Sequence, residues 1–422
     1  MPRRFALALA AVALLAPAAS ARAADAVPGE VVVGYANGRE AVVHTDDPQR
    51  AIARLRDRPG VRYAVPNVRA RASEFQLPDD PGRGTTPGGW QDVQWNFLGG
   101  FGVDAPAAWA HTDAARHPGG RGVTIAVLDT GVAYKNAGRY HRSPDLVGTR
   151  FVRGYDFVRH SPTPVDRNGH GTHVASTIAE TTNNGISLTG LAYNARIMPV
   201  RVLDSQGEGD AATIADGVRF AAKNGAKVIN LSLEFSTDVG ASEIPELLSA
   251  LRYAHSRGAM VIGASGNEAH QAVAYPARAT DVVSVGATTI HGCLSDFSND
   301  GRGLDLVAPG GGADAELRDD PNCKPDDPPG PDIYQLTLLG SSVRNFGLPS
   351  GYEGTSMAVP HVSATAALII ASRVLGAHPT PDEIERRLET TATDLGPPGR
   401  DHRYGAGLIN AGRATDPAIP VT

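Results

Sequence analysis

The chain lacks the features that mark several classes of protein. It has no long basic tract and its formal net charge is −6, so we expect no nucleic-acid partner. After residue 24 we find no apolar stretch as long as the roughly 20 residues that a membrane-spanning helix needs. No internal repeat is visible. What remains is an ordinary globular composition, 41% hydrophobic and 20% charged over 422 residues, enough for one large domain or two.

Residues 1–24 have the three-part layout of a secretory signal. Arg3 and Arg4 precede an apolar run over residues 5–16, and the small-residue sequence Ala21-Arg22-Ala23 follows it. An uncleaved membrane anchor is the competing interpretation, but the apolar run is too short to cross a bilayer. We therefore expect a secreted, extracellular protein with no membrane attachment after signal cleavage.

Cysteine is also scarce in this chain. Only Cys293 and Cys323 are present, so the chain can form at most one internal bridge. In an oxidising compartment, an even pair that encloses a loop is most simply a disulfide. Two free buried thiols are the alternative.

Before residue 95 the chain divides into two parts. Residues 25–76 indicate a compact α+β unit, with strands over residues 30–35 and 61–71 and a helix over residues 48–58 between them. Residues 77–94 are rich in Pro, Gly and Asp and are predicted to be an exposed linker. Exposed linkers are segments that proteases cut.

From residue 95 to residue 415, apolar strand runs alternate with helical patterns. The runs predict strands over residues 123–128, 197–203, 228–233, 260–264 and 282–285, and helices from residue 170 and over residues 212–224, 243–257 and 381–390. Such alternation predicts a doubly wound α/β domain, in which helices cover both faces of a parallel sheet. Sites in that architecture form beyond the carboxyl ends of the strands. Residues 309–348 interrupt the rhythm and are expected to form a surface insertion stapled by the cysteines.

A candidate nucleophile lies in residues 354–361, which read GTSMAVPH and lead into an apolar, small-residue segment. Ser356 at the mouth of a helix would expose its hydroxyl where the helix dipole favours negative charge. Pro360 fits the first helical turn, where a missing N–H is tolerated. A lone serine there is more often a simple helix cap, so its interpretation depends on residues upstream.

Three further polar groups fall at strand ends or helix starts. Asp129 follows a predicted strand in the sequence LDTG, where the sheet would hold its carboxylate rigidly, although an aspartate there is also a common turn former. His170 opens a helix in NGHGTHVA and can act as a general base. A metal pair with His173 is the alternative, but it lacks the glutamate of the zinc-helix motif. Asn267, in ASGNE, can donate to a developing oxyanion or simply form a turn.

Together, these side chains supply an orienting acid, a base, an oxyanion donor and a nucleophile. The order Asp, His, Ser and the motifs VLDTG, HGTH, SGN and GTSMA resemble the subtilisin-like serine proteases over about residues 95–412. The resemblance implies peptide-bond hydrolysis through an acyl-enzyme. Ser356 would attack the carbonyl, His170 would carry the proton, and Asp129 would hold the imidazolium. The Ser356 N–H and the Asn267 side chain would form the oxyanion hole.

The resemblance extends to the N-terminal unit. Its sequence PGVRYAVPN at residues 59–67 is similar to the family's inhibitory propeptide. This implies a zymogen whose own propeptide assists folding and blocks the site until it is cut away within about residues 72–94. A stand-alone binding domain is the alternative. The mature enzyme is expected to act as a monomer on polypeptide substrates.

In the family, an extended substrate pairs with two edge segments, as in strand addition. The matching positions, with one residue of the first specificity pocket, are Gly207, Glu208, Gly209, Ser232, Leu233, Glu234 and Ala274. Glu234 departs from the family pattern, which has a glycine there. With Glu208 and Asp166, it predicts an acidic pocket and a preference for basic or polar substrate residues.

Residues 183–190 read NNGISLTG and resemble the family's calcium loop. The resemblance implies a structural Ca²⁺ bound by oxygen atoms. The ligands would come from Gln94, Asp145, Thr182, Asn184, Ile186 and Leu188. A Gly/Asn-rich turn without metal is the alternative.

Other functions fit the sequence less well. An aspartic protease built on Asp129-Thr130-Gly131 needs two carboxylates in one site, and the chain has no second copy of the motif. A lipase or esterase of the nucleophile-elbow type needs a glycine two residues after Ser356 and a different triad order. A catalytically silent binding protein of the same fold is the remaining rival, although all four catalytic positions are filled.

Overall fold

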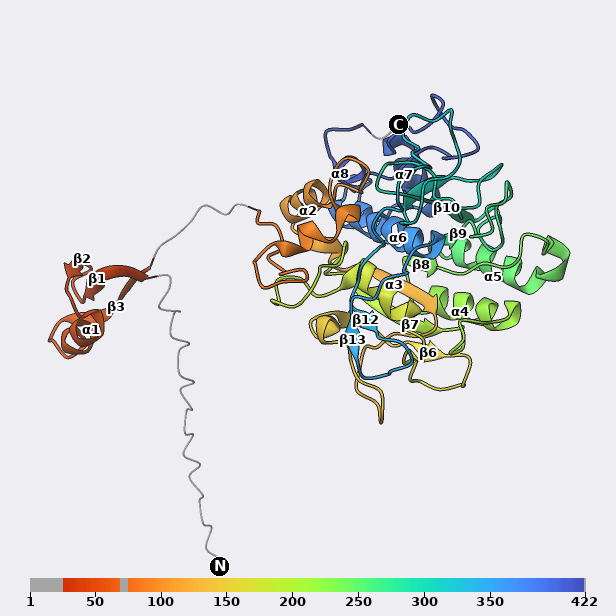
Figure 1. Cartoon of the computed structure of the whole chain (residues 1–422). Helices are drawn as coiled ribbons and strands as arrows, with labels where there is room; N and C mark the ends of the chain where they lie inside the picture. The colour runs from red at the N-terminus through yellow and green to blue at the C-terminus, as the bar shows by residue number, and fades with distance from the viewer. Residues whose placement is uncertain (1–25, 69–74, 421–422) are drawn as a thin grey trace, which may run out of the picture. The chain divides into compact units, whose positions relative to one another are not determined.

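The computed structural model describes residues 26–68 and 75–420, which form two units divided at residue 75 (Figure 1). The predicted signal segment and the last residues of the strand predicted over residues 61–71 lie outside the described ranges.

The N-terminal unit is an antiparallel sheet with one helix packed on it. Its elements are β1 (Ala26–Tyr35), β2 (Glu40–His44), α1 (Pro48–Arg56) and β3 (Val61–Val68), with strand order β2-β1-β3. The side chain of Asp47 caps α1, and Ile52 and Leu55 pack on Val31 and Val33 of β1. The sequence does not predict β2, because most of its residues are exposed and give no alternating apolar pattern.

The second unit is built on an eight-stranded sheet in the order β11-β10-β9-β8-β4-β7-β5, with β6 also paired to β7. Every pairing in it is parallel. The strands are β4 (Thr124–Asp129), β5 (Arg150–Phe151), β6 (Tyr155–Asp156), β7 (Arg196–Arg201), β8 (Val228–Leu231), β9 (Met260–Ala264), β10 (Val282–Thr288) and β11 (Leu306–Pro309). The central strands are buried along their whole length, as expected when both faces of a parallel sheet are covered.

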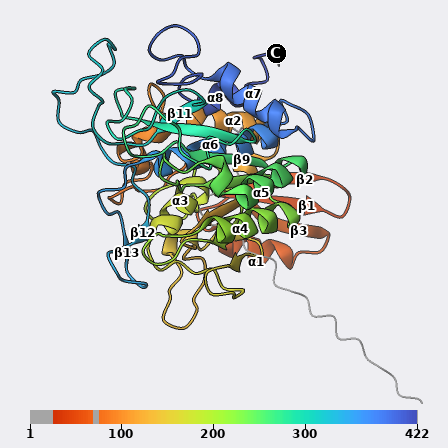
Figure 2. The same cartoon turned by 90° about the vertical axis from the view of Figure 1, so that its right-hand side faces the viewer.

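The two faces of β4 show how the sequence builds the layers. Ile125 and Val127 point into the core that holds α3 (His170–Ala179) and α6 (Thr355–Ser372). Ala126 and Leu128 point into the opposite core, with α4 (Ala211–Lys223) and α5 (Pro245–Ser256). In Figure 2, α4 and α5 face the viewer. This alternation confirms the predicted doubly wound α/β fold.

Shorter elements complete the second unit. They are α2 (Ala105–Ala114), α7 (Pro381–Thr391), α8 (Ala411–Thr415) and a two-stranded ribbon of β12 (Thr337–Leu338) and β13 (Phe346–Gly347). The three helices contribute buried side chains to the core around α6. The insertion holds the ribbon, and Cys293 and Cys323 are joined by a disulfide, which confirms the predicted pairing.

α6 is the central helix of this unit. It is 18 residues long with a mean hydropathy of 1.3, which by length and composition alone would suit a membrane. However, 83% of it is buried inside the protein. It is therefore a core helix, and its first turn lies at the carboxyl edge of the sheet, where the site forms.

The predicted linker differs from expectation, because residues 78–90 pack on the second unit. Asp80 and Trp90 are fully buried. The backbone N–H of Asp79 donates to the Asn183 side chain (2.9 Å), and that of Gly82 donates to the Ser187 carbonyl (2.6 Å). Pro, Gly and Asp here build a fixed turn rather than an exposed connection.

Candidate active site

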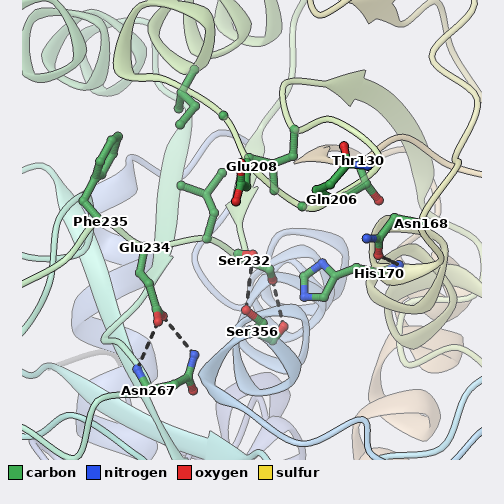
Figure 3. A pocket seen from close by; sticks show the side chains of 15 residues that line it. Thr130, Asn168, His170, Gln206, Glu208, Ser232, Glu234, Phe235, Asn267 and Ser356 are labelled. Atoms are coloured by element: carbon green, nitrogen blue, oxygen red, sulfur yellow. Dashed lines mark hydrogen bonds between the residues drawn. The ribbon is translucent and has the colours of Figure 1, made fainter.

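A cavity of about 590 Å³ opens at the carboxyl edge of the sheet. His170 at the start of α3, Asn267 after β9 and Ser356 at the start of α6 line it together (Figure 3). It is also lined by most of the predicted substrate-binding residues, namely Gly207, Glu208, Gly209, Ser232, Leu233 and Glu234. Residues far apart in the sequence thus meet where parallel-sheet architecture predicts a site.

Asp129 lies behind His170, fully buried at the end of β4. Its two carboxylate oxygens lie 2.8 and 3.0 Å from Nδ1 of His170, and the Thr130 N–H donates to it (2.7 Å). The imidazole is 26% exposed, on the cavity side. Burial alone would lower the pKa of His170, but the Asp129 carboxylate outweighs it, and the pKa is raised. A carboxylate on Nδ1 fixes the tautomer whose Nε2 can accept a proton.

Asp166 fixes the segment that carries His170. Its carboxylate accepts hydrogen bonds from the side chain of Thr130 (2.9 Å) and from the backbone N–H groups of Gly169 (3.1 Å) and Thr172 (3.0 Å). Only 2% of Asp166 is exposed, and it does not line the cavity. The expectation that it makes the substrate pocket acidic is therefore wrong. It instead stabilises the N-terminus of α3.

Ser356 is the second residue of α6. Its hydroxyl donates to the Ser232 carbonyl (3.2 Å), and the Ser232 hydroxyl donates back to the Ser356 carbonyl (2.8 Å). The His170 ring lies beside Ser356 in Figure 3, with no hydrogen bond between the two side chains. Such contacts are often loose without substrate and tighten when one binds.

Pro360 explains why the Ser356 carbonyl is free to bind Ser232. Because α6 begins at Thr355, Pro360 lies beyond the first helical turn, and the prediction that placed it within that turn is wrong. Lacking an N–H, Pro360 cannot donate to the carbonyl four residues earlier, which is that of Ser356. The Ser232 hydroxyl takes its place, and this contact ties α6 to the end of β8.

The side chain of Asn267 is held from two sides. Its Oδ1 accepts from the backbone N–H (2.8 Å) and the hydroxyl (3.1 Å) of Thr355. Its Nδ2 donates to Oε2 of Glu234 (2.9 Å), and its backbone N–H donates to Oε1 of the same carboxylate (3.2 Å) (Figure 3). Burial raises the pKa of Glu234, against the hydrogen bonds from Asn267. The sequence predicted neither the contact of Thr355 with Asn267 nor that of Glu234 with Asn267. The only sequence signal for either is the threonine in the motif GTSMA, which is Thr355.

Ala274, the predicted far wall of the pocket, is fully buried and does not line the cavity. Its N–H donates to the Ser265 carbonyl (2.8 Å). It therefore supports, from behind, the loop that carries Asn267.

The predicted calcium loop forms a compact turn against Asp145. The Asn184 side chain (2.7 Å) and the Leu188 N–H (3.3 Å) donate to the Asp145 carboxylate, while Asn184 Oδ1 accepts from the N–H of Ile186 (2.7 Å). Thr182 bonds the side chain of Thr189. Gln94 was predicted to bind the calcium ion through its side chain, but that side chain bonds protein atoms. Both of its amide atoms bond the backbone of Thr189, at 2.8 and 3.0 Å.

Two buried carboxylates, Asp80 and Glu180, join Asp145 at this loop. Asp80 accepts from the N–H groups of Asn183 (3.0 Å) and Asn184 (3.2 Å). Glu180 is fully buried, and neither of its oxygens has a hydrogen-bond partner among the described residues. Burial raises the pKa of Asp145 to about 7, against the hydrogen bonds from Asn184 and Leu188. Burial also raises the pKa of Glu180 well above its usual range, and the negative charge of Asp145 adds to that shift. Among the described residues, no lysine, arginine or histidine forms an ion pair with these three acids, and buried carboxylates of this kind fit a hard cation with oxygen ligands.

A further acidic group elsewhere has a simpler explanation. Asp305, Glu385 and Glu389 bring their carboxylates within 4.8 Å of one another. Arg400 forms ion pairs with Asp305 and with Glu389. The guanidinium group of Arg400 thus balances the negative charge of this acidic group.

Comparisons with known proteins agree on one family. A family model described as "Subtilase family" matches residues 120–407. The alkaline protease of Alkalihalobacillus alcalophilus is 38% identical over 77% of this chain and 70% of that protein. Subtilisin Savinase of Lederbergia lenta is 37% identical over 77% of this chain and 99% of that protein. A solved protease structure from Pseudoalteromonas arctica is 29% identical, with a TM-score of 0.62, covering 81% of this chain and 99% of that one.

Proposed function

Because this chain belongs to the subtilase family of serine endopeptidases, we propose that it is secreted as a zymogen and cleaves polypeptides through an acyl-enzyme on Ser356. One observation carries the assignment of roles. Both oxygens of a buried Asp129 meet Nδ1 of His170, and the same imidazole lines one cavity with Ser356. Nothing else along the cavity wall combines a nucleophile with an oriented base.

In the proposed reaction, the Ser356 oxygen attacks the scissile carbonyl carbon and its proton moves to Nε2 of His170. Asp129 stabilises the resulting imidazolium through Nδ1. His170 then returns the proton to the departing amine, which leaves Ser356 esterified. Water, deprotonated by the same imidazole, hydrolyses the ester and restores the serine.

The negative oxygen of the tetrahedral intermediate needs donors, and two are at hand. The Ser356 N–H belongs to the first turn of α6, where helix N–H groups have no intrahelical acceptor. Asn267 Nδ2 carries two hydrogens, and Glu234 accepts only one of them. Because Thr355 fixes the amide orientation, the second hydrogen is available to the substrate oxygen.

The N-terminal unit supports the zymogen proposal, and the packing of residues 78–90 favours a maturation point before this segment. Cleavage after Pro78 would detach this buried residue, whose carbonyl accepts a hydrogen bond from the indole N–H of the buried Trp90 (2.8 Å). We therefore expect the mature N-terminus within residues 72–78. N-terminal sequencing of the secreted form, with labelling of Ser356 by a fluorophosphonate, tests the proposal. A secreted, processed form that resists labelling with His170 intact would favour a silent binding protein instead.

We also propose a structural calcium ion at the 183–188 loop, with Asp145 as its carboxylate ligand and with Asp80 and Glu180 as neighbouring negative charges that favour a cation. When bound, the ion supplies the positive charge that the three buried acids require. Gln94 acts instead by holding the backbone of Thr189 in place.

Chelation by EGTA is expected to lower the thermal unfolding midpoint by about 4 °C if the site is saturated about 100-fold above its Kd. Added Ca²⁺ should restore the midpoint, and equal Mg²⁺ should not. Calorimetry of the Ser356→Ala protein measures this without self-digestion.

Asp80→Asn should remove most of the response to EGTA. Asp79→Asn is the matched control, because the neighbouring Asp79 is exposed and should keep the response. Equal midpoints with and without chelator in the unsubstituted chain would contradict the calcium proposal.

A further inference from the structure

Among the residues that the structure describes, two carboxylates and no lysine or arginine line the cavity. Glu208 and Glu234 contribute the acids, and His170 is the one basic side chain among the lining residues. Glu234 is only partly buried. A cavity with this negative charge attracts a substrate side chain that carries a positive charge.

Within the part of the chain that the structure describes, no lysine or arginine is among the main groups that act on the charge of Glu234. The ionisable groups that act on its charge are Glu268, a like charge, and His170, which is neutral when it acts as a base. Glu268 lies outside the cavity and has its own partners in the Thr237 N–H (3.3 Å) and the His270 imidazole (3.5 Å). Each oxygen of Glu234 accepts one hydrogen bond from Asn267, which leaves further lone pairs for a donor in the cavity.

The contact between Glu234 and Asn267 also fixes which substrate residue lies nearest. Asn267 Nδ2 is the proposed donor to the oxygen of the attacked carbonyl, and Glu234 lies one hydrogen bond beyond that donor. The side chain nearest to the attacked carbonyl belongs to the residue that supplies this carbonyl. That residue precedes the scissile bond.

An ionised Glu234 opposes the reaction of a neutral substrate. As the carbonyl oxygen becomes negative, a carboxylate one residue away repels it across a partly desolvated cavity. A positive side chain that pairs with Glu234 removes this repulsion and adds charge-assisted hydrogen bonds. A substrate with a positive side chain at this position should therefore have a higher kcat than a neutral substrate, as well as tighter binding.

We propose that Glu234 makes this enzyme select lysine or arginine immediately before the scissile bond. The inference rests on the proposed function, since it takes Ser356 and Asn267 as the reacting centre. It narrows the substrate class to polypeptides cut after basic residues.

The test compares peptides that differ only before the scissile bond, with lysine, Nε-acetyl-lysine or norleucine there. At pH 8, kcat/KM for lysine should exceed that for acetyl-lysine by about tenfold or more, as for other close charge pairs across an interface. In Glu234→Gln and Glu234→Gly the ratio should fall to near one. Glu268→Gln, which removes a neighbouring carboxylate outside the cavity, should keep the full ratio.

The pH dependence of this ratio gives a second readout. Both substrates need the same neutral His170, so its titration cancels in the ratio of the two kcat/KM values. The ratio should fall towards one as the pH drops through the pKa of Glu234, because the protonated acid no longer pairs with a cation. In Glu234→Gln the ratio should not change with pH.

Failure of the inference is distinguishable from failure of the proposed function. An enzyme that a fluorophosphonate labels and that cleaves all three peptides at similar rates overturns the role of Glu234 alone. A lysine preference that survives in Glu234→Gln overturns it as well. A processed chain that neither reacts with the label nor cleaves any peptide overturns both.

Discussion

Ser356→Ala is expected to lower kcat by about 10⁶-fold, the loss known for removal of the serine from triads of this kind. The substitution deletes one oxygen at the cavity wall and one 3.2 Å hydrogen bond to the Ser232 carbonyl. Alanine is a good helix former, so α6 should be unaffected. The loss should therefore appear in turnover and leave the thermal unfolding midpoint within a few degrees of the unsubstituted protein.

Turnover of a peptide substrate and incorporation of a fluorophosphonate measure this prediction together. Ser372→Ala is the matched control, because Ser372 lies on the same helix and its hydroxyl bonds only nearby backbone groups, the Ile369 carbonyl (2.8 Å) and the Val374 N–H (3.5 Å). It should keep both turnover and labelling. If Ser356→Ala retained a tenth of the activity, the nucleophile would have to be sought elsewhere.

The same variant separates two routes of maturation. If the enzyme removes its own N-terminal unit, Ser356→Ala should accumulate as the unprocessed chain. If another protease performs the cut, its N-terminus should fall at the same bond as in the active form. Either result leaves the assignment of Ser356 intact.

Much of the fold and the four central residues could be predicted from the sequence, because the relevant signals are local. Buried parallel strands appear as apolar runs. Each of the four residues lies at or near the end of a regular element: Asp129 ends β4, His170 opens α3, Asn267 lies three residues after β9, and Ser356 is the second residue of α6. The parallel arrangement then brings such positions to one edge of the sheet. The positions of these residues relative to the predicted strands and helices were therefore sufficient to predict that they lie close together.

What escaped prediction depends on contacts between distant segments. Glu234 and Asn267 are 33 residues apart, and Asp80 meets its backbone donors 103 and 104 residues further on. Neither pair leaves a local pattern. The composition of residues 77–94 predicted an exposed linker, because Pro, Gly and Asp are equally typical of exposed linkers and of fixed turns. Here too the deciding contacts are with distant segments. Only the burial of Asp80 and Trp90 separates the two.

Asp129→Asn is expected to lower kcat by about 10⁴-fold, the scale known for this substitution in serine proteases. The carboxylate accepts both from the Thr130 N–H and from Nδ1 of His170. An asparagine can accept with one atom only, and its NH₂ group would donate to Nδ1. The imidazole proton would then reside on Nε2, which could no longer accept the Ser356 proton.

The pH profile distinguishes this effect from a general loss of folding. Asp129 is the main group that raises the pKa of His170 against its burial, and activity requires the neutral imidazole. Without the carboxylate the pKa falls, so the acid limb of the residual kcat/KM should move to lower pH. Asp216→Asn, an exposed substitution on α4, should leave rate and profile unchanged. An acid limb that stayed in place in Asp129→Asn would mean that another carboxylate, such as Asp166 or Glu234, governs the titration of His170.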